Sequence, residues 1–212
     1  MNPELLIKHL LVGQMQTNCY LVIDQHAKEA VIIDPGDDGG YISNTLSDLG
    51  VTPTQIIATH GHFDHILATR ELQLAFQIPF KVHAADEFLV NRMQQSAAFF
   101  LKIQITDPPP RINSYIKAGE VISVGDYKLQ IFETPGHTPG SICLYTSDAG
   151  ILFSGDTLFA HGGVGRTDFE YSSLQNLQTS LRRILSYPAE TVIYSGHGSS
   201  STIAAERPFH EG

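Results

Sequence analysis

The sequence predicts an α/β fold in which two β-sheets pack face to face with helices outside them, a four-layer αββα sandwich. Short apolar, β-branched runs recur along the chain with turn residues between them, and segments with helical periodicity separate these runs. Asp107 is followed by three prolines, which end any helix and divide the chain into two halves. Each half has strands, a polar loop with His and Asp, and a helix. This pattern is typical of sheets that bury one face against each other and the other under helices.

Ten segments have the composition and flanking turn residues of strands. They are residues 5–12, 20–23, 30–33, 55–59, 80–83, 121–124, 128–132, 142–145, 151–153 and 191–194. Four segments are expected to contain helices: residues 41–49, 64–76, part of 86–101, and 174–185. The first of these ends at Gly50, and the last follows two candidate capping residues, Ser172 and Ser173.

The length of 212 residues suits one domain, residues 1–212, with a large core, since 42% of the residues are hydrophobic and only 17% are charged. No apolar stretch is long enough for a membrane span, and the first residues lack the pattern of a secretory signal, so a cytoplasmic protein is expected. Its two cysteines, Cys19 and Cys143, are far apart in apolar surroundings and are expected to be buried thiols.

The formal net charge is −9, and no run of Lys or Arg is present. Binding to nucleic acid or to an anionic membrane requires a positive surface, so neither partner is expected. A small molecule is the expected partner, while the oligomeric state is left open. The ten histidines are numerous beside thirteen Lys plus Arg.

Four of the histidine and aspartate residues are concentrated directly after the strand predicted at residues 55–59. His60, His62, Asp64 and His65 are four candidate metal ligands within six residues. Side chains two residues apart in an extended segment point the same way, so His60 and His62 can reach one ion, and Asp64 and His65, beyond a turn, can reach another. His and Asp ligands without thiolates favour hydrolytic zinc or a similar ion over a closed structural site. The alternative is a polar loop with hydrogen-bonded histidines.

Three further candidate metal ligands lie in three separate segments, each at or near the end of a predicted strand. His137 lies in a loop with two Pro and two Gly, Asp156 follows the strand at 151–153, and His197 stands between two glycines after the strand at 191–194. Taken singly, each has an ordinary explanation as a turn residue. Together with the first cluster they form one set of candidate ligands.

This set, with its spacing and its flanking Gly and Pro, resembles the metallo-β-lactamase superfamily over almost the whole chain. The resemblance implies the four-layer sandwich and a dinuclear site along one sheet edge. It implies that His60, His62 and His137 hold one metal, that Asp64, His65 and His197 hold the other, and that Asp156 bridges them. Two divalent ions are expected, with zinc favoured and iron or manganese as alternatives.

At several positions the sequence differs from known branches of the superfamily, and these differences limit the branches that it resembles. The best-known di-zinc β-lactamases have Cys at the position of Asp156 and no His after the Asp of the first motif, which disfavours an antibiotic-degrading role. Flavo-diiron proteins have Glu at the position of His62. Residues 163–169 resemble a loop of glyoxalase II-like hydrolases and persulfide dioxygenases, and the ending around His197 is most similar to the short bacterial glyoxalase II-like group.

The resemblance implies hydrolysis of an anionic thioester such as S-lactoylglutathione, or of a related hydroxyacyl thioester, by a metal-bridging hydroxide. Asp64 would orient the hydroxide as well as bind metal, and Asp156 would hold both ions. Two alternatives stay open: a mononuclear iron persulfide dioxygenase, and a noncatalytic member of the fold. Full-length glyoxalase II enzymes carry a C-terminal glutathione-binding helical domain, which is not expected in the 15 residues after His197.

Two residues outside the ligand set are also candidates. Arg166 is a candidate for binding a substrate anion, with an ion pair to nearby Asp168 as the alternative. Asp34 resembles an aspartate of the family that fixes a ligand imidazole, with a plain turn as the alternative. Residues 86–105 would cover the metal edge in this fold, either as a lid or as part of the core.

Overall fold

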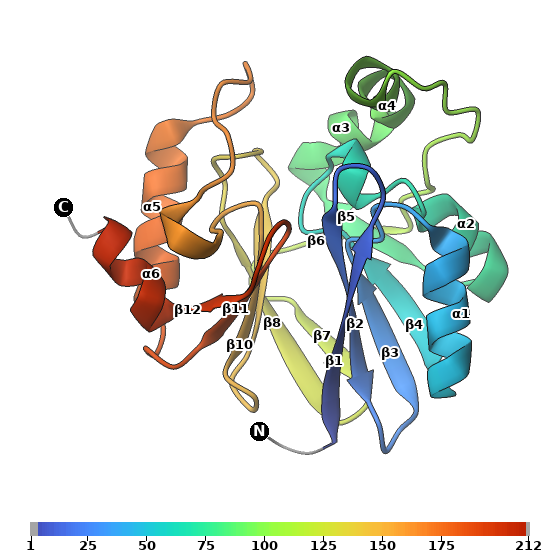
Figure 1. Cartoon of the computed structure of the whole chain (residues 1–212), viewed down its shortest axis with the longest axis horizontal. Helices are drawn as coiled ribbons and strands as arrows, with labels where there is room; N and C mark the ends of the chain where they lie inside the picture. The colour runs from blue at the N-terminus through green and yellow to red at the C-terminus, as the bar shows by residue number, and fades with distance from the viewer. Residues whose placement is uncertain (1–3, 211–212) are drawn as a thin grey trace.

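Two six-stranded sheets lie face to face in the computed structural model, which describes residues 4–210 (Figure 1). In spatial order the first sheet consists of β1 (Leu5–Val12), β2 (Thr17–Asp24), β3 (Glu29–Ile33), β4 (Thr52–Ile57), β5 (Phe80–His83) and β6 (Ser114–Ile116). The second consists of β12 (Ser201–Thr202), β11 (Val192–Ser195), β10 (Ile151–Gly155), β9 (Ile142–Thr146), β8 (Tyr127–Glu133) and β7 (Val121–Val124).

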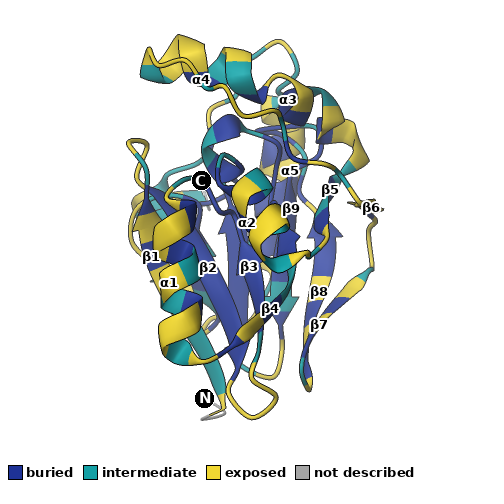
Figure 2. Ribbon diagram, turned by 90° about the vertical axis from the view of Figure 1, so that its right-hand side faces the viewer, coloured by how far each residue is buried: buried dark blue, intermediate teal, exposed yellow. Residues whose placement is uncertain are grey.

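Helices cover the outer face of each sheet (Figure 1). The outer face of the first sheet is covered by α1 (Gly39–Leu49) and α2 (Thr69–Phe76), and that of the second by α5 (Leu174–Leu185) and α6 (Ile203–His210). The helices α3 (Glu87–Asn91) and α4 (Met93–Leu101) lie above one edge of the sandwich, at the top of Figure 1. Figure 2 shows buried strands behind helices whose outer faces are exposed. The predicted four-layer sandwich is therefore confirmed.

The hydrophobic core has three parts that match these layers. Successive side chains of a strand point to opposite faces, so Val22 of β2 packs between the sheets with Phe153 of β10, while its neighbour Leu21 packs under the first helical layer. Leu177 of α5 belongs to a third cluster on the outer face of the second sheet. Alternation along the strands is what lets each sheet bury both faces.

The predicted helix at residues 64–76 is the main element that differs. A 3₁₀ turn occupies Phe63–His65, and α2 begins only at Thr69. The short β6 and β12 and the helix α6 were not expected from the sequence. Both cysteines are buried free thiols, as predicted.

The direction of the strands decides where the site forms. In the first sheet β3, β4 and β5 run parallel, and in the second β10 and β11 run parallel. β8 and β10 both pair antiparallel with β9, so β8 shares the direction of β10. Polar loops at the carboxyl ends of these strands can therefore meet at one edge. Within residues 4–210 no helix is both long and apolar enough to cross a membrane.

Candidate metal centre

The seven predicted ligand residues all lie in loops at the carboxyl ends of strands, and the structure brings them together. They are His60, His62, Asp64 and His65 after β4, His137 after β8, Asp156 after β10, and His197 after β11. Both sheets contribute, so the cluster spans the seam between the two halves of the chain.

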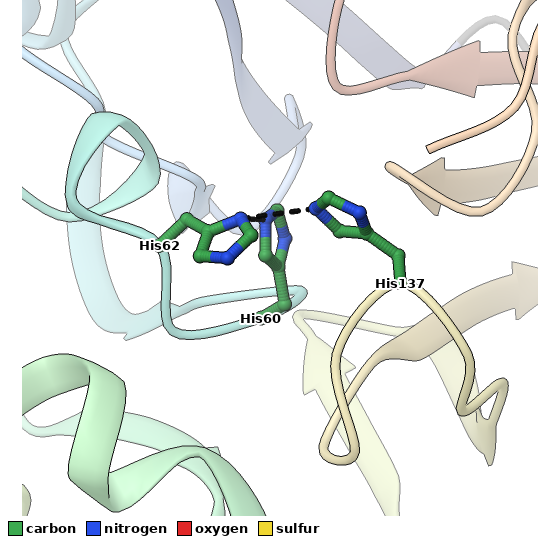
Figure 3. Close-up of side chains that lie close together, drawn as sticks. All are labelled: His60, His62 and His137. Carbon is green, nitrogen blue, oxygen red and sulfur yellow. Dashed lines mark hydrogen bonds between the residues drawn. The ribbon is translucent and has the colours of Figure 1, made fainter. Parts of the chain in front are cut away.

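Three imidazoles from the two sheets form the first cluster (Figure 3). Nε2 of His60 lies 3.0 Å from Nδ1 of His62, and that same Nδ1 lies 3.0 Å from Nε2 of His137. The extended backbone at His62 keeps its side chain on the same side as that of His60. One nitrogen of each ring therefore points to a common centre.

Asp64, His65 and His197 form the second cluster, with their ligand atoms within 4.8 Å of one another. Oδ2 of Asp64 lies 3.3 Å from Nε2 of His197 and 3.7 Å from Nε2 of His65. The 3₁₀ turn at Phe63–His65 lies between His62 and this cluster, and it leaves the His65 ring close to that of His60, with ring centres 4.2 Å apart.

The carboxylate of Asp156 lies between the two clusters. Oδ2 of Asp156 is 3.6 Å from Nε2 of His137 in the first cluster and 3.7 Å from Nε2 of His197 in the second. Its other oxygen, Oδ1, is 3.5 Å from Nε2 of His65. Gly196 packs directly against this carboxylate, and a Cβ there would collide with Asp156 and the His65 ring.

Hydrogen bonds on the outer side of three rings fix which nitrogen carries the proton. Nδ1 of His137 donates to the carbonyl of Arg166 at 2.8 Å, and Nδ1 of His65 donates to Asp34 at 3.0 Å. The Thr59 hydroxyl donates to Asp34 at 2.7 Å, so it accepts from Nδ1 of His60 at 3.1 Å. In the neutral form of these rings, the inward Nε2 atoms carry lone pairs. Converging lone pairs are the arrangement that a cation requires.

The fit to a metal can be tested on the buried polar atoms. Nε2 of His65 and Oδ1 of Asp156 are both buried and have no hydrogen-bond partner among residues 4–210. A buried polar atom without a partner is unfavourable, and a bound cation would satisfy both atoms. The residues present therefore fit metal binding, and the His/Asp cluster is compatible with two metal ions.

The charges within the cluster shift its pKa values in opposite directions. Burial, together with the surrounding imidazoles, lowers the pKa of His60, and burial beside His137 lowers that of His62 to about 3. Burial also disfavours protonated His65, but the carboxylates of Asp156, Asp34 and Asp64 outweigh it and raise its pKa to about 10. Although burial alone would raise the pKa of Asp64, the neighbouring His65 and His197 lower it. Without metal, the site therefore keeps a proton on His65.

Asp34 lies where the resemblance implied, beside a ligand imidazole. It follows β3 with a left-handed backbone, φ 52°, and is buried. Besides His65 and the Thr59 hydroxyl, its carboxylate accepts from the Thr59 backbone N–H at 2.7 Å. Asp34 thus orients His65 directly and His60 through Thr59.

Asp86 and Tyr171 also shape the site, and sequence reasoning missed both. The buried Asp86 carboxylate, whose pKa is raised by burial, accepts from the N–H of Gly61 at 2.8 Å and of Gly140 at 2.7 Å, and so joins the loops that carry His60 and His137. The Tyr171 hydroxyl lies 2.9 Å from Nε2 of His62. The position of Asp86 just after β5, an acidic residue at a strand end, was the sequence feature that could have identified it.

A cavity of about 370 Å³ opens over the clusters. Its lining residues are Met15, His62, Phe63, Asp64, Ser96, Phe100, His137, Asp156, Phe159, Val164, Gly165, Arg166, Phe169, Tyr171 and His197. The segment 86–105 contributes Ser96 and Phe100 of α4, so it covers part of this edge.

Arg166 lies on the cavity wall and also forms the ion pair that was the alternative to anion binding. Its Nε donates to Oδ1 of Asp168 at 2.7 Å, and Nη2 donates to Oδ2 at 2.5 Å. This hydrogen bonding lowers the pKa of Asp168 to about 2. The ion pair is exposed, and the guanidinium also lies 4.5 Å from the centre of the Phe169 ring.

Comparison with known proteins agrees with this geometry. A family model described as the metallo-beta-lactamase superfamily matches residues 12–197. The chain is 33% identical to the probable metallo-hydrolase YqgX of Bacillus subtilis, covering 97% of each chain. It is 31% identical to hydroxyacylglutathione hydrolase GloC of Haemophilus influenzae, covering 95% of this chain and 94% of that one.

Solved structures are similar over nearly the whole chain. BLEG-1, described as a B3 metallo-beta-lactamase, has a TM-score of 0.88 at 33% identity and covers 98% of this chain and 100% of its own. TTHA1623 in a di-iron-bound form has a TM-score of 0.84 at 33% identity, with 94% and 96% covered. ETHE1 from Myxococcus xanthus has a TM-score of 0.76 at 27% identity, with 97% and 83% covered.

Proposed function

Because the chain belongs to the metallo-β-lactamase superfamily, we propose that its two clusters bind two divalent ions and that it hydrolyses a hydroxyacyl thioester such as S-lactoylglutathione. The position of Asp156 between the clusters carries this proposal, since its two oxygens lie 3.5 to 3.7 Å from imidazole nitrogens of both. Residues 1–212 act in this proposal as one catalytic domain, because the ligands come from both sheets.

The proposed ligands follow the geometry of the clusters. His60, His62 and His137 would hold one ion, Asp64, His65 and His197 would hold the other, and Asp156 would contact both. When bound, two such ions supply a hydroxide at neutral pH and polarise the carbonyl of the substrate. Zinc is the proposed metal, and a relative with a di-iron site makes iron the main alternative.

In this proposal the protein positions the nucleophile and does not need to protonate the leaving group. Asp64 reaches the cavity wall, and its carboxylate accepts the hydrogen bond that orients the nucleophile toward the carbonyl carbon. A C–O bond forms, the C–S bond breaks, and the products are a carboxylate and a thiol. Since a thiolate is a stable leaving group, the reaction needs no strong acid from the protein.

The experiment that tests this function combines metal analysis with turnover. Protein reconstituted with zinc should contain two ions per chain and hydrolyse S-lactoylglutathione, and Asp156→Ala should abolish the activity. One tightly bound iron and no hydrolysis would overturn the proposal. A β-lactam belongs in the same assay, because BLEG-1, which is 33% identical to this chain, is described as a B3 metallo-beta-lactamase.

A persulfide dioxygenase with one iron is the second candidate. Two observations favour it: the similarity to ETHE1 and the loop at residues 165–169, Gly-Arg-Thr-Asp-Phe. Oxygen consumption with glutathione persulfide by the iron-loaded protein would support this candidate over the hydrolase. A protein that binds two metals but turns over neither thioesters, lactones, phosphodiesters nor persulfides would instead be a noncatalytic member.

A further inference from the structure

The cavity over the metal clusters has walls made mainly of aromatic rings. On one side Phe63 and Phe100 are stacked, with ring centres 5.7 Å apart and planes 12° from parallel. On another side Phe169 and Tyr171 are stacked, with ring centres 5.1 Å apart and planes also at 12°. Phe159 adds a further ring beside His197, at 6.1 Å. Phe63, Phe100 and Phe159 line the cavity with apolar rings, while Phe169 stacks on Tyr171 and also contacts the Arg166 guanidinium, 4.5 Å from its ring centre.

Charged groups on these walls are few and already have partners. Arg166 is the single Lys or Arg among the described lining residues, and its Nε and Nη2 are both bonded to Asp168. The two acidic lining residues, Asp64 and Asp156, belong to the metal clusters. A glutathione group carries two carboxylates and an ammonium, and each loses free energy when it leaves water without a partner. The walls offer no set of partners for such a group.

The apolar character continues to the mouth of the cavity. Phe100 is 42% exposed and Met15 is 41% exposed, although both are large apolar residues that line the cavity. Exposed apolar residues gathered at a cavity are typical of a binding site. Phe99, the neighbour of Phe100 on α4, is more exposed, at 66%, but does not line the cavity.

We infer that this cavity binds an aromatic arm of the substrate, that is, an aromatic ring attached on either the acyl or the thiol side of the reacting carbonyl. The inference rests on the proposed function, because it assigns the substrate class of the same site. A charged carrier such as glutathione, if present, stays outside the aromatic walls and contributes little to recognition. Phe100 and Phe169 are the specificity-determining residues.

Three thioesters separate the possibilities with the zinc-loaded protein. S-lactoylglutathione has no aromatic arm, S-mandeloylglutathione has one on the acyl side, and the S-benzyl thioester of lactic acid has one on the thiol side. At least one aromatic thioester should exceed S-lactoylglutathione in kcat/KM by about tenfold or more, the scale on which a fitted apolar group discriminates. Equal or higher kcat/KM with S-lactoylglutathione would overturn the inference.

Variants test whether the aromatic walls cause this preference. Phe100→Ala and Phe169→Ala should each reduce the preference severalfold, while Tyr41→Ala, a control at an exposed aromatic residue of α1 outside the cavity lining, should leave it unchanged. A preference that survives Phe100→Ala and Phe169→Ala would contradict the inference. Metal content is measured for each variant, so that loss of the metal centre is not mistaken for loss of specificity.

A binding measurement distinguishes failure of this inference from failure of the proposed function. Calorimetric titration of the zinc-loaded protein with mandelate and with lactate compares an aromatic with a small hydroxy acid that share the same polar groups. Mandelate should bind about tenfold more tightly, and Phe100→Ala should remove the difference. If no thioester is hydrolysed but mandelate is preferred, the proposed function fails and the cavity assignment stands. If thioesters are hydrolysed but lactate binds as well as mandelate, the cavity assignment fails.

Discussion

Nδ1 of His65 lies 3.0 Å from the carboxylate of Asp34, and both side chains are buried. This contact leaves Nε2 of His65 facing Asp156 with no hydrogen-bond partner among the described residues. Asp34 therefore sets both the orientation of the ring and the nitrogen that is free to bind metal.

Asp34→Asn should weaken metal binding at the cluster of Asp64, His65 and His197 by about 10- to 100-fold, the usual effect of changing a group that orients a ligand. Asparagine tolerates the left-handed backbone found at position 34, so the substitution tests the charge and not the fold. The affinity is measured by competition with a chelator of known affinity.

A matched control is Asp38→Asn, because Asp38 also has a left-handed backbone, φ 55°, but its carboxylate accepts a hydrogen bond from the N–H of Gly13 and belongs to neither cluster. Its metal affinity should equal that of the wild type. Unchanged affinity in Asp34→Asn would contradict the role assigned to this residue.

Tyr171→Phe should weaken the binding of the other proposed ion, the one assigned to His60, His62 and His137. The hydroxyl of Tyr171 lies 2.9 Å from Nε2 of His62, and its removal frees that ring to rotate and to change tautomer. We expect about tenfold weaker binding and an altered visible spectrum of the cobalt-substituted protein. Tyr41→Phe, at an exposed position of α1, should change neither. A spectrum and affinity like those of the wild type would rule out this role for Tyr171.

The metal-free protein should lose stability as the pH rises above neutral. The pKa of His65 in the folded protein is about 10, above its usual value of about 6.5. The protonated ring therefore contributes fully to the free energy of unfolding below pH 6.5, and this contribution is lost as the pH rises toward 10. Between pH 7 and 8.5 the free energy of unfolding should fall by at most about 1.4 kcal/mol per pH unit for this one proton.

Chemical denaturation at pH 7, 7.75 and 8.5 measures this slope. In the zinc-loaded protein we expect His65 to be a neutral metal ligand, so the same slope should disappear. The metal-free protein should also lose stability as the pH falls below about 6.5. His62 then binds a proton in the unfolded chain but not in the folded protein, where its pKa is about 3. A metal-free protein that gains stability from pH 7 to 8.5 would refute the assignment of the proton to His65.

Asp168→Asn should improve the binding of an anionic thioester. The substitution breaks the two-bond contact between Asp168 and Arg166 and releases a guanidinium on the cavity wall. The KM for S-lactoylglutathione should fall by a few-fold, and the double variant Asp168→Asn with Arg166→Ala should lose that gain. Equal KM values in all three proteins would mean that Arg166 serves only in the ion pair.

Sequence patterns predicted the elements that are long and regular. The strands and helices with several alternating or periodic apolar residues were found, and the candidate ligand residues could be expected at one edge because they follow strands directly. The strand β6 was not predicted because it has three residues, two of them exposed, and therefore no apolar pattern. The helix α6 was not predicted because it contains Pro208, a residue type that normally ends a helix.

The tertiary contacts of the site could be predicted only in part. Asp34 was found through the resemblance, whereas Asp86 joins two loops 25 and 54 residues away, a relationship that no local spacing reveals. The contact of Tyr171 with His62 spans 109 residues. The two roles of Arg166, on the cavity wall and beside Asp168, were distinguishable only after the loop was placed.

The most direct test of the two-metal centre is a crystal structure of the zinc-loaded protein with anomalous diffraction measured at the zinc absorption edge. Two anomalous peaks are expected, one within bonding distance of His60, His62 and His137 and one within bonding distance of Asp64, His65 and His197, with Asp156 touching both. A single peak, or peaks away from these residues, would contradict the account.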